Sequence, residues 1–310
     1  MRALLEPSLY YFSVVARYGS LSAAADKLGV SISALSRHIT KLEGDVGVAL
    51  FERHARGMEL SHAGKTLYSH AQRSIADAES VTQDIRGEDA KRARRISIAC
   101  TEGMAFDFLP VCLSAFRQRE PDCSIDMKVV SPDMTSQMLL NGEASIAMAF
   151  SVKPESGVKV QFSMPAPVMA LMRDTHPLAK RTSLSLTDVT AYPLLLQDEG
   201  QTNRQLFDIA CNVEGIKVIP AVSSQYVAGL YRFVQTMEGA IMPSGYVAVA
   251  KRMVADRLVA VPFVNQVLGQ RRLQVKTLAG RPLTGLANQC LDWIVSQLRQ
   301  MDEHLRAESR

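Results

Sequence analysis

The sequence has little cysteine and no long apolar run. Its 310 residues include five cysteines, which are scattered and never spaced as CxxC or CxxH. Neither a zinc site nor a disulfide framework is therefore predicted. A membrane-spanning helix needs about 18 or more consecutive apolar residues. No such run occurs, since charged residues interrupt even the most apolar stretch, 247–264. We expect no membrane partner.

Targeting and catalytic signals are missing as well. The first 21 residues lack the unbroken apolar segment and the small-residue cleavage site of a secretion signal, so we expect a cytoplasmic protein. No nucleophile elbow, phosphate-binding glycine loop or HExxH zinc helix is present. We therefore expect no enzyme, no catalytic residue, no metal and no cofactor.

The composition is that of an ordinary folded protein. Hydrophobic residues make up 47% and charged residues 21%, and the length suits about two domains. Residues 1–95 carry 14 Lys and Arg against 11 Asp and Glu, whereas the remaining residues carry 21 against 20. The positive excess lies at the front, which points to an anionic partner.

Three short helices are predicted in the first 46 residues. The first follows Ser8 as its N-cap and ends at Gly19, the second runs between Ser20 and Gly29, and the third follows Ser31. Apolar residues recur at helical spacing in each helix. Two short helices joined by a tight glycine-containing turn form a helix-turn-helix.

The polar face of the third helix has short hydrogen-bonding side chains and one Arg. Such side chains reach base edges and phosphates in double-stranded DNA without holding the helix out of the groove. The alternative is the solvated face of an ordinary helical hairpin. The candidate DNA-binding residues on this helix are Ser31, Ile32, Ser33, Ser36, Arg37 and Thr40.

A β-hairpin wing follows, with strands at 50–53 and 58–60. Its tip offers Arg53, His54 and Arg56, cationic groups suited to a phosphate backbone or a minor groove. The alternative is a solvated basic turn.

A long helix is predicted from Ser61, its N-cap, to Arg86. Apolar and small residues alternate along it in steps of four and three, as in a heptad seam for dimerisation. The alternative is packing onto the chain's own second domain. The seam consists of Leu67, Ala71, Ser74, Ala78, Val81 and Ile85.

From residue 95 onward, short strands alternate with helices, which predicts an α/β fold with mostly parallel sheets in two lobes. A single helix is expected at 105–118 and a strand at 218–222. The last strands, at 258–263 and 273–278, are expected to return to the first lobe. The predicted domains are 1–61 (all-α winged helix-turn-helix), 62–91 (linker helix and hinge) and 92–310 (two lobes).

Ligands in such sheets bind at the carboxyl ends of strands, beside helix N-termini. Hydroxyl groups at these points suit a small carboxylate or another polar anion, whereas an inward-pointing Glu102 favours an amine-bearing or heterocyclic metabolite. The alternative for each Ser or Thr is a helix cap. The candidate ligand-binding residues, which would bind an effector if the chain is a regulator, are Thr101, Glu102, Ser131, Pro132, Phe150, Ser151, Gln197, Thr202, Ser223 and Ser224.

The sequence resembles the LysR-type transcriptional regulators. Dense agreement covers the first 64 residues, and weaker agreement covers most of the rest. The matching residues at the front are Leu9, Phe12, Val15, Gly19, Ser20, Ala23, Ala24, Leu28, Val30, Ser31, Ala34, Leu35, Ser36, Arg37, Ile39, Leu42, Glu43, Gly47, Leu50, Phe51, Glu52, Arg53, Leu60, Ser61, Ala63 and Gly64.

The resemblance implies a DNA-reading winged helix-turn-helix, a dimerising linker helix and a two-lobed effector domain similar to periplasmic binding proteins. It also implies dimers or dimers of dimers (homotetramers) on promoter DNA, controlled by a small-molecule effector. Many family members have Gln and Pro where this chain has Ile32 and Ser33, so the operator preference does not transfer. Ile32 cannot donate a hydrogen bond but suits a thymine methyl group.

Two other functions compete with this interpretation. A thiol-based redox sensor of this family needs two nearby cysteines in the second lobe, and the sequence offers only Cys211 there, with Cys100 in the first lobe as either an exposed or a buried thiol. An enzyme or solute-binding protein on the two-lobed fold lacks a catalytic motif or an export signal.

Overall fold

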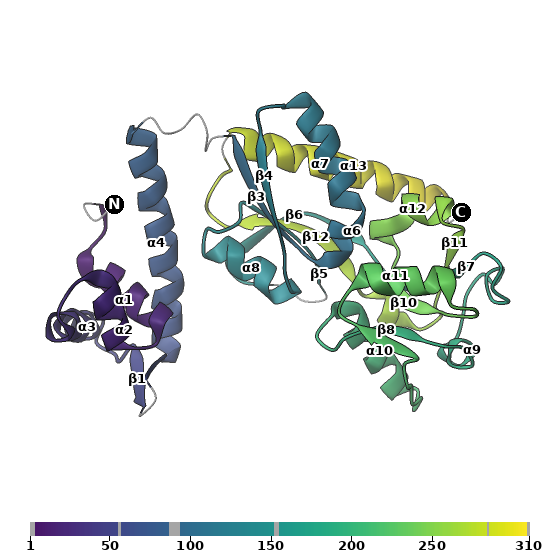
Figure 1. Ribbon diagram of the computed structural model, residues 1–310, viewed down its shortest axis with the longest axis horizontal. Coiled ribbons are helices and arrows are strands. Elements are labelled where there is room, and N and C mark those ends of the chain that lie inside the picture. Colours follow the sequence, from purple (N-terminus) through teal and green to yellow (C-terminus); the bar gives the residue numbers. More distant parts are fainter. Residues whose placement is uncertain (1–3, 55–56, 87–93, 152–154, 284, 309–310) are drawn as a thin grey trace. The chain divides into compact units, whose positions relative to one another are not determined.

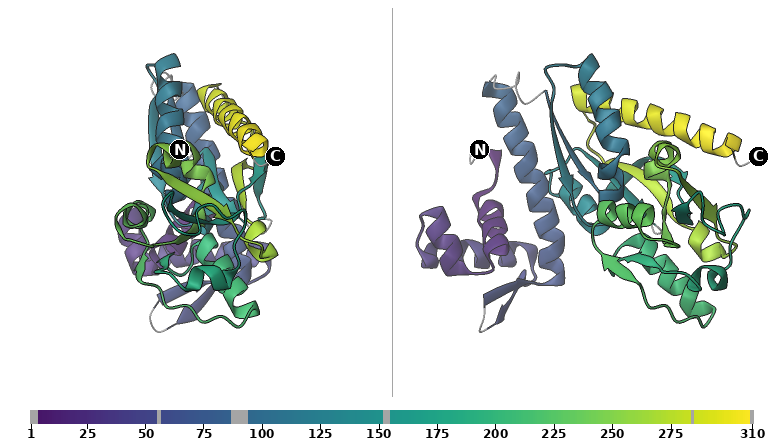
Figure 2. Two further views of the ribbon diagram at one scale, coloured as in Figure 1. Left: turned by 90° about the vertical axis from the view of Figure 1, so that its right-hand side faces the viewer. Right: turned by 45° about the vertical axis from the view of Figure 1, so that its right-hand side comes forward.

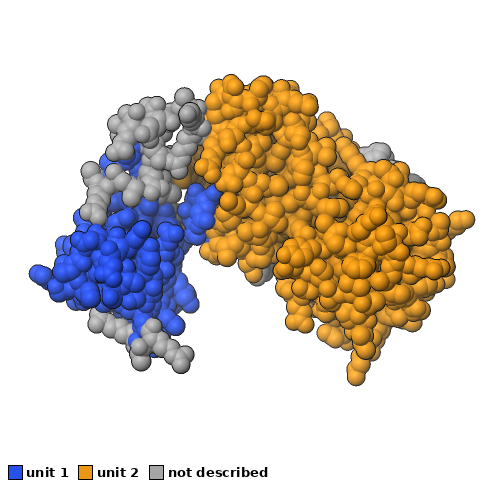
Figure 3. Space-filling view, viewed as in Figure 1, with its two compact units in different colours: residues 1–93, 140–143 blue, residues 94–139, 144–310 orange. Residues whose placement is uncertain are grey.

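The computed structural model describes residues 4–54, 57–86, 94–151, 155–283 and 285–308. The chain divides into two compact units (Figure 3). The first comprises residues 1–93 with 140–143, and the second comprises residues 94–139 with 144–310. Within the described residues, no helix has both the length and the apolarity needed to cross a bilayer.

The first unit is a winged helix-turn-helix followed by one long helix (Figure 1). Its core is formed by buried apolar residues such as Phe12, Leu35, Ile39 and Leu50. The wing pairs Phe51 with Leu60 in an antiparallel register. Its elements are α1 (Pro7–Tyr18), α2 (Leu21–Leu28), α3 (Ile32–Val46), β1 (Phe51–His54), β2 (Gly57–Leu60) and α4 (His62–Arg86).

Side-chain caps start most of these helices as predicted. Ser20, Ser31 and Ser61 each accept a hydrogen bond from a backbone N–H in the first turn of the following helix. The first helix differs, because its N-cap is Glu6 and not Ser8. A proline at the first helical position has its φ already set and no N–H to satisfy, so Pro7 fixes the start two residues earlier than expected.

The second unit contains two lobes joined by two chain crossings. Lobe I comprises β3 (Arg95–Cys100), β4 (Ser124–Val129), β5 (Ile146–Ser151), β6 (Val158–Pro165), β12 (Arg272–Leu278), α6 (Glu102–Phe106), α7 (Phe108–Arg119), α8 (Pro132–Leu140) and α13 (Gly285–Glu308). Lobe II comprises β7 (Val168–Arg173), β8 (Leu195–Gln197), β9 (Val222–Ser224), β10 (Met242–Gly245), β11 (Leu258–Pro262), α9 (Leu186–Thr190), α10 (Thr202–Val213), α11 (Val227–Thr236), α12 (Ala250–Ala255) and the short 3-10 helices η2 (Val247–Val249) and η3 (Gln266–Gly269).

The lobe I sheet has the strand order β4-β3-β5-β12-β6. Ile98 and Cys100 on one face of β3 belong to the core beneath α7 and α13, which lie together in Figures 1 and 2. Ala99 points to the opposite face, where it packs with Leu139 of α8. Helices therefore cover both faces, as expected for an α/β lobe.

The sheets are mixed, which corrects the expectation of mostly parallel sheets. In lobe I, β3 runs parallel to β4 and β5, but β12 runs antiparallel to β5 and β6. In lobe II, β7 pairs antiparallel with β10 and β11, and only β8 and β9 form a parallel pair. Strand direction depends on distant pairing partners, which local patterns do not reveal.

Several element boundaries also differ from the prediction. Only β12 returns to lobe I, because β11 pairs with β7 of lobe II. The single helix expected at 105–118 is broken at Asp107 into α6 and α7. The strand expected at 218–222 begins only at Val222, and β6 and α9 were not predicted.

Candidate DNA-reading surface and effector pocket

Helix α3 presents a polar face to solvent. Its opposite face buries Leu35 and Ile39 in the core of the first unit. Short polar groups, one guanidinium and the half-exposed Ile32 together form the kind of surface that contacts phosphates and base edges. The predicted reading residues are exposed, apart from the partly buried Ser36: Ser31, Ile32, Ser33, Ser36, Arg37 and Thr40.

Two side chains that sequence reasoning missed hold α3 in place. His38 Nδ1 lies 3.1 Å from Ser8 Oγ, and its ring packs edge-on against Tyr11, which fixes α3 to α1. Glu43 Oε1 accepts hydrogen bonds from the backbone N–H groups of Leu50 (2.8 Å) and Phe51 (3.3 Å). The orientations of α3 and of the first wing strand are therefore linked by one carboxylate.

The wing is only partly described. His54 is exposed in β1, and its Nε2 lies 3.7 Å from Glu52 Oε2. The side chain of Arg53 and all of Arg56 lie outside the described residues. Phosphate contacts by the wing therefore stay predictions.

The dimerisation seam on α4 is corrected at its N-terminal end. Ala71 is fully buried, and Leu67 packs against the same core of the first unit. These two residues pack within the chain because α4 begins against the bundle and covers its core. The rest of the seam stays a prediction. Ser74 is partly exposed, Ala78 is only 6% exposed within the single chain, and the side chains of Val81 and Ile85 lie outside the described residues.

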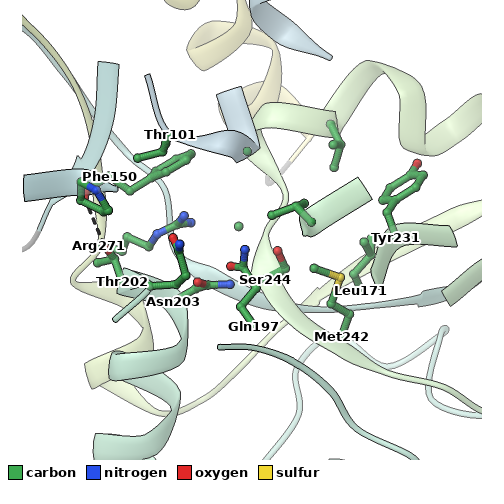
Figure 4. A pocket seen from close by; sticks show the side chains of 16 residues that line it. Thr101, Phe150, Leu171, Gln197, Thr202, Asn203, Tyr231, Met242, Ser244 and Arg271 are labelled. Carbon is green, nitrogen blue, oxygen red and sulfur yellow. Dashed lines mark hydrogen bonds between the residues drawn. The ribbon is translucent and has the colours of Figure 1, made fainter. Parts of the chain in front are cut away.

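A pocket lies between the two lobes of the second unit (Figure 4). Its walls combine a polar end and an apolar end. Thr101, Asn203 and Arg271 lie at the polar end, and Leu171 and Met242 lie at the apolar end. This division suits a ligand with one polar group and an apolar body.

Five of the predicted effector-binding residues line this pocket. They are Thr101, Pro132, Phe150, Gln197 and Thr202. Thr202 Oγ1 donates a hydrogen bond to the carbonyl oxygen of Phe150 at 3.2 Å, so it bridges the two lobes directly. Thr101 occupies the N-cap position of α6, but its hydroxyl makes no capping bond and has no partner among the described residues.

Five other predicted residues lie away from the pocket wall. Glu102 Oε1 accepts from the backbone N–H of Ala228 at 3.5 Å, in the first turn of α11, where the helix dipole favours an acid. Ser224 Oγ accepts from the N–H of Tyr226 in a turn. The residues outside the lining are Glu102, Ser131, Ser151, Ser223 and Ser224. None of the described lining residues carries a carboxylate. An amine-bearing ligand would therefore not find in this lining the carboxylate that was expected from Glu102.

Sequence reasoning missed Arg271, which is only 5% exposed. Its guanidinium carbon lies 3.6 Å from the centroid of the Phe150 ring, and burial lowers its pKa to about 9. Its Nε and Nη1 atoms have no hydrogen-bond partner among the described residues. Arg271 precedes an exposed Arg272, and no local signal distinguishes the buried residue of the pair from its neighbour.

The five cysteines are buried, which corrects the idea of Cys100 as an exposed thiol. Burial raises the pKa of Cys100 to about 12 and that of Cys211 to about 11. Because the thiolate is the reactive form and reaction needs access, these thiols suit core packing. No observation on the described residues favours thiol sensing.

Comparisons with known families assign the chain. Residues 7–65 match the family "Bacterial regulatory helix-turn-helix protein, lysR family", and residues 89–299 match the "LysR substrate binding domain". The second match covers more than half of the chain. The chain therefore belongs to the LysR family of DNA-binding transcriptional regulators with an effector-binding domain, which confirms the sequence-based expectation.

Comparisons with individual proteins agree with this family assignment. The RuBisCO operon transcriptional regulator of Allochromatium vinosum is 26% identical over 204 residues, which are 64% of this chain and 66% of that protein, or about two thirds of its length. The crystal structure of full-length CbnR with its target DNA matches with a TM-score of 0.54 at 20% identity, covering 96% of this chain and 100% of that one.

The Synechocystis CcmR regulatory domain in complex with 2-PG matches with a TM-score of 0.56 at 18% identity, covering 67% of this chain and 98% of that one. The likeness to both solved structures is a likeness of fold. It confirms the two-lobed α/β effector domain behind a helix-turn-helix.

Proposed function

We propose that this chain regulates transcription by binding promoter DNA in the cytoplasm through α3 and the wing. The observation that carries the proposal is the exposed face of α3, which His38 and Glu43 hold in a fixed orientation. A rigid reading helix loses little conformational freedom when it enters a major groove. The structure of CbnR, which shares the fold, was determined in complex with its target DNA.

The test starts from a duplex selected out of a random library by the full-length chain. Binding to that duplex is then measured by fluorescence anisotropy over a range of salt concentrations. We expect log affinity to fall steeply with log salt. Arg37→Ala should weaken binding by about 10-fold or more. Arg173→Ala removes an exposed charge from lobe II and serves as the matched control.

We further propose that a small molecule in the pocket between the lobes controls DNA binding, and that the chain performs no catalysis. A ligand that touches Thr101 of lobe I and Asn203 of lobe II binds best at one spacing of the lobes. Such differential affinity is what shifts a conformational equilibrium. CcmR, a protein of the same fold, was solved with 2-PG.

Self-association completes the proposal. The C-terminal part of α4, beyond the turns packed on the first unit's core, would pair with a second copy to form a dimer or a dimer of dimers. The whole helix has 25 residues, about 38 Å at 1.5 Å per residue, which suffices for a coiled-coil contact. Light scattering of Ser74→Glu tests this, with dissociation expected if the seam is an interface; Ser74 is the better position because Ala78 is only 6% exposed within the single chain.

A further inference from the structure

Arg271 lies where the chain crosses between the lobes. Its carbonyl oxygen accepts a 3.0 Å hydrogen bond from the N–H of Ala166, which belongs to the other crossing, between β6 and β7. Its side chain therefore starts from the junction of both connections and ends in the pocket. A ligand group that binds this guanidinium therefore contacts the chain where the two connections between the lobes meet.

The surroundings of the Arg271 guanidinium supply room and orientation but no counter-charge. A side chain on Gly245 would place its Cβ 1.8 Å from Arg271 Nη1, so only a glycine leaves space for the guanidinium there. The guanidinium carbon lies 3.6 Å from the centroid of the Phe150 ring, and this cation–π contact restricts where the guanidinium can lie. Among the described pocket residues, none is Asp or Glu, and Nε and Nη1 stay without a partner.

A buried cation without a partner is costly unless a negatively charged group joins it. The planar guanidinium matches a carboxylate, which accepts two parallel N–H bonds. The Thr101 hydroxyl, which is buried and unpartnered among the described residues, is a further donor lining the same pocket. Beyond this polar end, and past Gln197 and Ser244, the pocket wall carries the apolar side chains of Leu171 and Met242 (Figure 4).

We propose that the effector is a monocarboxylate with a compact apolar or aromatic body, whose carboxylate binds Arg271 and whose body contacts the apolar end of the pocket. The inference rests on the proposed effector role of this pocket. It reverses the amine-bearing ligand expected from Glu102. One cation and an apolar remainder fit a single negative charge better than a phosphate dianion.

The test compares carboxylates with their neutral carboxamides on the full-length protein. Isobutyrate and benzoate are paired with isobutyramide and benzamide, and inorganic phosphate is tested separately. Thermal melting and affinity for the selected duplex are measured for the wild type, Arg271→Met and the adjacent control Arg272→Met. Arg272 is exposed and bonds Ser163, so its loss leaves the pocket intact.

We expect the carboxylates, but neither amides nor phosphate, to raise the melting temperature of the wild type and of Arg272→Met. Arg271→Met should bind carboxylates on the order of 100-fold more weakly. Without ligand, this variant should melt no lower than the wild type, because a neutral chain of similar length replaces an unpaired buried cation. It should still bind DNA.

The proposal is overturned if amides or phosphate act as strongly as carboxylates, if carboxylates shift nothing at high millimolar concentration, or if Arg271→Met keeps the carboxylate response. It is also overturned if Arg271→Met melts well below the wild type without ligand, because Arg271 would then be a structural residue. Failure of the proposed function gives a different result. The wild type itself would then show no salt-dependent DNA binding, or its DNA affinity would stay the same when a compound binds in the pocket.

Discussion

The first unit and the pocket each contain an arginine that we propose for recognition, and the two lie in opposite environments. Arg37 is exposed on α3, where water solvates the charge at no cost, and it needs only a rigid helix beneath it. Arg271 is 5% exposed and lies over the Phe150 ring, and its Nε and Nη1 atoms have no hydrogen-bond partner within the described part of the chain. The exposed cation suits a salt-dependent contact with a polyanion, whereas the buried one suits a specific contact with a small anion, because low dielectric strengthens it.

The two regions are also shaped by glycines in different ways. A Cβ on Gly64 would lie 2.0 Å from the backbone oxygen of Leu50, so α4 and the wing approach more closely than any side chain permits. The three heavy atoms nearest to a Cβ on Gly245 all belong to the side chain of Arg271. A backbone clash cannot be relieved by a rotamer change, so a side chain at position 64 should cost more stability than one at position 245.

Gly64→Ala should have the largest effect on stability. The clash with Leu50 forces α4 away from the wing, and overpacking of this kind costs about 3 kcal/mol. Urea unfolding of the full-length chain should show an early transition for the first unit, while the second unit unfolds as in the wild type. Gly44→Ala, whose Cβ meets nothing within 4 Å, is the matched control. An unchanged first transition would contradict the close approach.

Gly245→Ala should act on ligand binding more than on stability. The new methyl group displaces the Arg271 guanidinium from its stacked position, so carboxylate affinity should drop by about 10-fold or more. Isothermal titration with benzoate measures this affinity. DNA affinity without ligand should not change. Equal benzoate affinity in the variant and the wild type would show that Arg271 does not depend on this space.

Ser31→Ala should destabilise the reading helix by about 1 kcal/mol, because the backbone N–H of Ala34 loses its cap. We expect the first unit to unfold at a lower urea concentration and the DNA affinity to fall. Ser22→Ala changes an exposed serine within α2 and should alter neither. If both variants behave alike, the cap does not contribute to stability.

His176 should make the stability of lobe II depend slightly on pH. Burial lowers the pKa of His176 in the folded chain, so the unfolded chain binds the proton first as pH falls. The stabilising contribution is thus complete above the ordinary histidine pKa of about 6.5 and is lost as pH falls below it. Urea midpoints of the second unit at pH 7.5 and 5.5 measure the loss, which His176→Gln should reduce. An undiminished pH effect in that variant would assign it to other groups.

The amino-acid sequence by itself determined the winged helix-turn-helix. Ser20 and Ser31 cap their helices, and Leu35 and Ile39 fall on one face, because caps and amphipathic stripes depend on residues three or four apart. It also located the strand ends at which Thr101 and Thr202 line the pocket, since a strand and the helix that follows it are neighbours in the chain.

Only the tertiary structure decided the rest. The return of β12 to lobe I, its antiparallel pairing and the burial of Arg271 depend on segments about 100 residues apart, such as Ala166 and Arg271. No local pattern marks which of two adjacent arginines faces a cavity. Burial of a charge is a property of all the elements packed around it, and therefore becomes visible only once the lobes are assembled.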